Sequence, residues 1–400
     1  MRISTSTVYT TGLNNMLTQE SAYLDASNVV SSGKRVVNPS DDSSAASQAV
    51  AVQQASALND QYADTRSTVS SSLATEETTL DSISDAIVSA KTLLIQAGDG
   101  TLSDEDRASI ATSLQGIYDT LVSLSNTTDS SGNYIFSGYQ TQSQAFTEDA
   151  DGNVVYQGDD NVVSQQVSAT TSMATGDNGA TVFMSVGSSA GFLATAASDN
   201  TGTVTFDGPD ITDTSDANYG TGFTLTFAVD DDGVATYSID GGDAVAYESG
   251  DTLEINGLSL TLEGAPADGD SISVSAAADA EPNLFTTLAN VIAALNTPTS
   301  DDDTAAAALA NTLSTSSREL DNALDNVLTV RTSVGTRMNE LDVLDTVGDS
   351  MALTYATRLS DLTDADYTES VSTYTSLQVA LQAAQQTFAS VQDMSLFDYI

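Results

Sequence analysis

The sequence contains no cysteine and no histidine, and only ten of its 400 residues are lysine or arginine. Without cysteine the chain forms no disulfide, thiolate metal site or cysteine nucleophile. Without histidine it lacks the commonest catalytic base and metal ligand. The 56 acidic residues bring the formal net charge to −46. Binding to nucleic acid or to an anionic membrane requires a basic surface, so we expect neither as a partner.

The sequence also lacks segments that would direct it into or across a membrane. No apolar run approaches the roughly 18 residues that a membrane-spanning helix needs. The N-terminal stretch MRISTSTVYTTGLNNM has no apolar region of the kind found in a cleaved secretory signal. If the protein leaves the cell, we therefore expect a route that removes no signal peptide.

Motifs for catalysis are missing as well. There is no P-loop and no GxGxxG motif after a predicted strand, and among 56 acids any chosen carboxylate pair is uninformative. The segment DDDG (Asp230 to Gly233) invites comparison with a calcium loop, but Ala228 and Ile239 stand where that loop needs acids. We therefore predict no enzyme activity, no cofactor and no metal site, and we interpret DDDG as a hairpin turn.

The few basic residues that are present lie near the two ends of the chain. No lysine or arginine occurs from Ala108 to Ser317. The two ends therefore share a character that the middle lacks, which predicts terminal segments that pair around an inserted middle. We interpret the strong acidity as a source of solubility, in a medium salty enough to screen the self-repulsion.

The first segment predicts an amphipathic helix with a weak heptad seam. Its members are Leu13, Met16, Glu20, Tyr23, Ser27 and Val30. Gly33 follows as a residue suited to a left-handed helix end. Lys34 and Arg35 then stand beside the negative end of the helix dipole.

A helix break follows this basic pair. Pro39 disfavours helical geometry for the residue before it. Ser40 is the expected cap of the next helix, and Asp41 and Asp42 fall in its first turn, where acids complement the positive dipole end. The basic pair thus closes one helix and the acidic pair opens another.

Helical periodicity continues up to about residue 125 and returns after Pro282. We predict helices from about residue 42 to 97, after a Ser103–Asp106 capping box, from about 284 to 295, and after caps at Ser300 and Thr363. The strongest seams are Leu73, Glu76, Leu80, Ile83, Ile87, Ala90, Leu94 and Ala97; Leu313, Ser317, Leu320, Leu324, Val327, Arg331, Val334, Met338 and Leu341; and Tyr374, Leu377, Leu381, Ala384, Phe388 and Val391.

The middle of the chain alternates apolar and polar residues, which predicts strands. Phe223 to Val229 alternates in this way, as do Ala235 to Ile239 and Leu258 to Leu262. The sequence therefore predicts an elongated α+β protein, whose N- and C-terminal helices pair as a coiled-coil-like bundle around an inserted, mostly β outer domain. The seams alone leave open whether they form an intramolecular core or pack against other copies.

Several stretches carry a resemblance to a known family. MRIST and SGKRVVNPSDDSSAA resemble the N-terminal signature of the bacterial flagellar axial proteins, the flagellin superfamily, and the segment from Tyr367 to the end resembles its C-terminal helix. GNYIFSGYQTQSQAFT, VVYQGDD, LTDADYTES and SLFDYI are similar to the hook–filament junction branch of that superfamily. The resemblance divides the chain into terminal helices (1–40 and 363–400), halves of a helical rod (41–130 and 281–362), a β-rich part of the rod (131–197) and a variable outer β domain (198–280).

This resemblance implies a structural adaptor that links the flagellar hook to the filament outside the cell. The implied partners are neighbouring copies, another hook-associated protein, flagellin and a cytoplasmic export chaperone, and the implied route is flagellar type III export. Residues of the matching motif are Lys34, Arg35, Pro39, Ser40, Asp41 and Asp42. Candidate assembly residues are Leu13, Met16, Tyr23, Leu377, Leu381, Phe388, Val391, Leu396 and Phe397.

Two other functions remain open at this stage. One is flagellin itself, the bulk filament subunit, which differs in tail chemistry and in copy number. The other is a secreted acidic adhesin or carbohydrate-active enzyme that uses the β domain.

Overall fold

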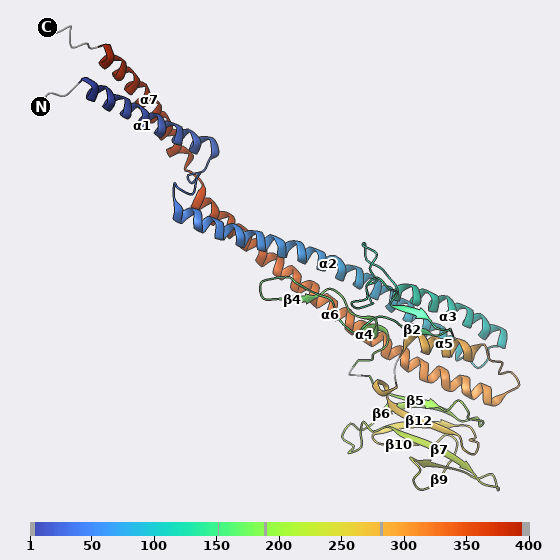
Figure 1. Ribbon diagram of the computed structural model, residues 1–400. Helices are drawn as coiled ribbons and strands as arrows, with labels where there is room; N and C mark the ends of the chain where they lie inside the picture. The colour runs from blue at the N-terminus through green and yellow to red at the C-terminus, as the bar shows by residue number, and fades with distance from the viewer. Residues whose placement is uncertain (1–4, 151, 188–189, 281–282, 394–400) are drawn as a thin grey trace, which may run out of the picture. The chain divides into compact units, whose positions relative to one another are not determined.

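The computed structural model describes residues 5–150, 152–187, 190–280 and 283–393 (Figure 1). The chain divides into two compact units. The first contains the residues up to Thr65 and those from Val343 onward, and the second contains Arg66–Asp342. Two long helices, α2 (Ser43–Ala97) and α6 (Asp303–Thr363), contribute to both units.

In its described part, the first unit has helices as its regular elements, joined by short connections. Helix α1 (Thr5–Ser32) lies antiparallel beside α7 (Tyr367–Asp393), as Figure 1 shows. Gly33 ends α1 with a φ of +69°, the left-handed conformation predicted for it.

Three helices are capped by a different residue from the one that the sequence predicts. Asp42, not Ser40, caps α2, because its carboxylate accepts the Ala45 N–H at 2.9 Å. Asp366, not Thr363, caps α7, and Asp302, not Ser300, caps α6. In each case an aspartate immediately before the helix accepts from the free amides of the first turn, which favours it over a more distant hydroxyl.

The helical part of the second unit follows the predicted seams. All eight seam residues of α2 from Leu73 to Ala97 are buried. Helix α3 (Asp104–Ser125) begins with the predicted Ser103–Asp106 capping box and packs against α5 (Leu284–Leu295). Short hairpins β1 (Phe146–Glu148) with β2 (Val154–Tyr156), and β3 (Ser164–Gln166) with β4 (Ser172–Ala174), accompany α4 (Gly179–Phe183).

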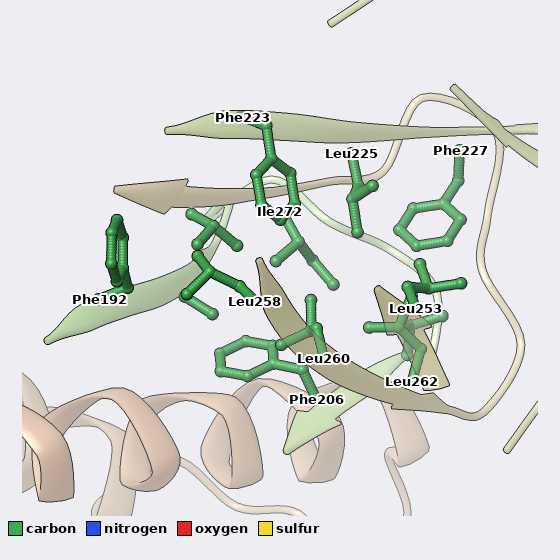
Figure 2. Packing of buried hydrophobic residues seen from close by; sticks show 13 residues of the cluster. Phe192, Phe206, Phe223, Leu225, Phe227, Leu253, Leu258, Leu260, Leu262 and Ile272 are labelled. Atoms are coloured by element: carbon green, nitrogen blue, oxygen red, sulfur yellow. The ribbon is translucent and has the colours of Figure 1, made fainter. Parts of the chain in front are cut away.

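The remaining strands form a two-sheet domain. One sheet has the order β5-β12-β7-β8-β9 and the other the order β10-β11-β6, all antiparallel. Figure 2 shows apolar side chains of both sheets meeting in one core. The strands are β5 (Phe192–Ala196), β6 (Thr205–Ile211), β7 (Phe223–Val229), β8 (Ala235–Ile239), β9 (Val245–Ala246), β10 (Thr252–Ile255), β11 (Leu258–Glu263) and β12 (Ser271–Ala276).

The predicted DDDG turn joins β7 to β8. The Asp230 carbonyl accepts the Gly233 N–H at 2.9 Å, and Gly233 has a φ of +80°.

Buried polar contacts hold the β domain to α6. Asn311 accepts the Phe206 N–H at 3.1 Å and donates to the Val204 carbonyl at 2.8 Å.

Many exposed hydroxyls of the long helices donate to the backbone one turn earlier. Thr65 donates to the Gln61 carbonyl at 2.9 Å in α2, and Thr329 and Thr357 form equivalent bonds in α6. These helices therefore satisfy their surface hydroxyls within themselves.

The terminal helices pair around a mostly β insert, which confirms the predicted α+β class. The predicted division into six segments, with boundaries at residues 40 and 362, stays a prediction. The two compact units divide elsewhere, inside α2 and α6.

Candidate assembly surface

The basic residue Arg35 ties together three segments of the helix break. Its backbone N–H donates to the Thr363 carbonyl at 2.8 Å, and its guanidinium donates to the Leu362 carbonyl at 2.9 Å. The same guanidinium pairs with Asp42 at 3.2 Å. The Ala45 N–H and then Arg35 lower the pKa of Asp42. The break after α1 is thus fastened to the break before α7.

The other motif residues shape the same connection. Lys34 forms an isolated antiparallel bridge with Asp364. Asp41 accepts the N–H groups of Val37 and Asn38 at 3.1 and 2.7 Å, which closes the turn around Pro39. The Ser40 hydroxyl lies 3.5 Å from an Asp41 carboxylate oxygen and is exposed. The motif therefore builds the joint between helices, and no described contact gives it a chemical task.

The seam between α1 and α7 is aromatic. Tyr9 and Phe388 have ring centroids 5.2 Å apart, and the stacked rings of Tyr23 and Tyr374 are 5.1 Å apart with their hydroxyls 2.8 Å apart. A Cβ on Gly12 would lie 3.1 Å from Phe388, so the small residue allows this close approach.

Six of the candidate assembly residues are half-buried on these two helices. They are Leu13, Met16, Tyr23, Leu377, Leu381 and Phe388. The side chain of Val391 and the residues Leu396 and Phe397 lie outside the described part. Exposed apolar side chains that the sequence argument did not select are Leu17, Leu24 and Val379, which are 52%, 54% and 60% exposed. They lie off the seam, and only the pairing geometry shows which apolar residues are left over.

No side chain of α1 or α7 that the structure describes is buried. The pair thus leaves its best apolar residues half in contact with solvent. Isolated helices depend on tertiary packing for most of their stability. A further packing partner would bury this surface, which makes the α1–α7 pair the candidate assembly surface.

A second feature that sequence reasoning missed lies in the core of the other unit. Glu76 of α2 is 2% exposed, and its Oε1 accepts the Asp177 N–H at 2.9 Å. Its Oε2 is buried without a hydrogen-bond partner, and Arg337 of α6 pairs with Asp177. Burial, and then the Asp177 carboxylate, raise the pKa of Glu76 to about 8. The sequence signal was a glutamate at a core position of a heptad seam.

The described residues also bear on membrane insertion and on metal binding. None of the helices in the described ranges is both long and apolar enough to cross a membrane. Among the same residues no group of three or more acidic side chains is placed to hold a metal ion.

Comparisons with known proteins agree on one family. The bacterial flagellin N-terminal helical region matches residues 3–141. Flagellar hook-associated protein 3 of Salmonella typhimurium is 34% identical over 397 residues, covering 99% of each chain. The crystal structure of hook-associated protein 3 from Legionella pneumophila has a TM-score of 0.70 at 28% identity, covering 78% of this chain and 98% of that one. A structure described as the flagellar junction protein FlgL from Legionella pneumophila has a TM-score of 0.66 at 26% identity, covering 79% of this chain and 100% of that one. The chain therefore belongs to the flagellar hook-associated protein 3 family.

Proposed function

We propose that this protein is the structural junction subunit between the flagellar hook and the flagellin filament, and that it has no catalytic role. The names of its relatives place them at the hook and at a junction. The observation that carries the proposal is the α1–α7 pair, whose described side chains are all at least partly exposed to solvent. A subunit that folds fully only among neighbours needs such a surface.

The physical basis is mass action. A neighbour that binds the ordered helix pair and not the disordered chain stabilises the ordered form in proportion to the logarithm of its concentration relative to its dissociation constant. The terminal helices would stay weakly ordered before assembly and gain order within it. We propose neighbouring copies, another hook-associated protein and flagellin as these partners.

Before assembly the chain would have to leave the cell unfolded. We propose flagellar export without removal of a signal peptide, with a cytoplasmic chaperone on the C-terminal helix. The protein would then reside outside the cell at the hook–filament junction.

The first experiment measures the amount of this chain relative to hook protein in purified intact flagella. No more than a ring or two of subunits per hook is the result expected for a junction subunit. A bulk amount that rivals the filament would identify a flagellin instead. Complete absence from flagella would overturn both and turn attention to an adhesin role for the β domain.

A variant tests the role of the helix pair directly. Leu381→Asp places a charge on the half-buried seam of α7, and we expect it to abolish incorporation while the β domain stays folded. Val234→Asp is the matched control, because Val234 is 54% exposed in the turn between β7 and β8. Cells carrying Leu381→Asp that still grow normal filaments would contradict the proposed role of the pair.

A further inference from the structure

A polar pocket lies beside α2 in the unit formed by residues 66–342. Its volume is about 340 Å³, a size typical of sites that hold small organic molecules. Thr68, Ser72 and Glu76 of α2 line one side, each one turn from the next. Residues from the stretches 129–141 and 161–177 line the other side, so the whole pocket belongs to one compact unit.

Glu76 contributes an unpaired acceptor to this pocket. The residue is 2% exposed, and its Oε1 accepts the Asp177 N–H at 2.9 Å. Its Oε2 is buried and has no hydrogen-bond partner among the described residues. A Cβ on Gly176, which also lines the pocket, would lie 3.5 Å from this oxygen, so the missing side chain leaves Oε2 beside the pocket. An unpaired buried acceptor costs free energy, which a ligand that donates to it would recover.

The charges around the pocket favour a cationic ligand. Asp129 and Asp177 line it together with Glu76, and none of the described lining residues is basic. Arg337 of α6 pairs with Asp177, which leaves the Asp129 carboxylate to attract a positive charge. The net charge of −46 adds a long-range attraction of the same sign. A divalent metal is a poor candidate, because no group of three or more acidic side chains in the described ranges is placed to hold one.

The remaining lining residues suit an alkyl chain that carries the positive charge. Tyr134, Ile135, Val162 and Val163 give the pocket an apolar part beside its acidic part. The Ser72 hydroxyl donates to the Thr68 carbonyl at 3.2 Å, so its oxygen keeps lone pairs that accept from a ligand. An ammonium group carries three N–H donors and no acceptor, which matches these oxygens.

We propose that this pocket binds a primary alkylammonium group, whose N–H donates to Glu76 Oε2 while its alkyl chain lies against Val162 and Val163. Two sources present this chemistry, a free diamine and the lysine side chain of another protein. The pocket involves neither α1 nor α7, so the proposal is independent of the assembly surface and of the proposed function.

Binding of a cation at this place should release a proton from Glu76. Burial, and then the Asp177 carboxylate, raise the pKa of Glu76 to about 8, so the empty site is protonated near neutral pH. The other charged groups that face this carboxyl are Asp177 and Arg337, which pair with each other. An ammonium favours the carboxylate, and it stays charged itself because its ordinary pKa is about 10.4. The affinity should therefore rise about tenfold from pH 6 to pH 7 and level off above the pKa of Glu76.

Calorimetric titration of the full chain with n-butylamine tests the proposal, in concentrated sodium chloride to screen unspecific attraction. Glu76→Gln should weaken binding about tenfold or more and abolish its pH dependence. Glu77→Gln is the matched control, because the neighbouring residue carries the same charge but does not line the pocket. Ser72→Leu fills the pocket one turn from Glu76 and should abolish binding with the carboxyl intact. Circular dichroism verifies that each variant is folded.

Three outcomes would overturn the proposal. They are absence of n-butylamine binding to the natural chain, equal binding by Glu76→Gln, and equal binding of tetramethylammonium, which has the charge but no N–H donor. A comparison of putrescine with an acetylated peptide that contains one lysine identifies the source. Tighter binding of putrescine supports a free diamine as the ligand, and tighter binding of the peptide supports a lysine side chain of a partner protein.

Discussion

The buried carboxyl of Glu76 predicts that the unit formed by residues 66–342 loses stability as the pH rises. Its pKa is about 8 in the folded chain against an ordinary value of 4.5. Between these two values the folded state keeps a proton that the unfolded state has released, so the free energy of unfolding falls with increasing pH. Each pH unit in this window is worth about 1.4 kcal/mol. The full effect is therefore on the order of 4–5 kcal/mol, complete once the pH exceeds the folded pKa.

The substitution Glu76→Gln should remove this pH dependence. The amide has the same shape, carries no proton that titrates, and its oxygen still accepts the Asp177 N–H that Glu76 Oε1 accepts at 2.9 Å. We expect the variant and the natural chain to unfold at similar denaturant concentrations near pH 5, and the variant to be the more stable by several kcal/mol at pH 8.5. Chemical denaturation at five or six pH values, followed by circular dichroism, measures the difference.

The matched control is Glu77→Gln on the same helix. Glu77 accepts from Arg331 at 2.7 Å at a partly exposed site, and an ion pair of this kind is worth at most about 1 kcal/mol. Its loss should shift the whole profile slightly without changing the slope, because Glu76 remains. Parallel profiles for the natural chain and Glu76→Gln would refute the assignment of a retained proton to Glu76.

Two further substitutions test the joint and the β core. Arg35→Ala removes the guanidinium contacts to Leu362 and Asp42. We expect amide hydrogen exchange in residues 33–42 and 362–366 to become about tenfold faster, while exchange in residues 66–342 stays unchanged. Exchange that became faster in both regions alike would contradict a local role for Arg35. Leu260→Ala deletes a side chain that is 1% exposed between the two sheets and should cost about 2–5 kcal/mol in chemical denaturation, whereas a cost under 1 kcal/mol would show that this core does not behave as a packed one.

Much of the helical architecture was predictable because its signals are local and periodic. The seam from Leu73 to Ala97 is buried throughout, and the left-handed Gly33 and the turn at Asp230 appear where their residue types demand them. The caps were less predictable. Serine, threonine and aspartate compete within a few positions of each helix start, and only the backbone geometry shows that Asp42 rather than Ser40 reaches the free amides.

The candidate surface depended on information that no single segment carries. The seam residues of α1 and α7 were identifiable from spacing, but how far pairing buries them was not. The exposed Leu17 and Val379 are apolar residues that periodicity alone assigns to no face. Glu76 is a related case. From the sequence, a glutamate on a heptad seam is interpreted as a polar residue that the seam tolerates. Only the fold shows that Asp177 and Arg337, about 100 and 260 positions further along the chain, lie beside it.

The hydroxyls that bond back along the long helices have a mechanical consequence. Such bonds tilt backbone carbonyls and bend a helix slightly at each site. The part of α6 that belongs to the unit of residues 66–342 runs from 303 to 342 and contains no proline, so it lacks the commonest cause of a sharp kink. At 1.5 Å per residue these 40 residues span about 60 Å, and sites such as Thr312 and Thr329 divide the curvature into small steps. Under a bending load this stretch of α6 would therefore deform gradually along its length.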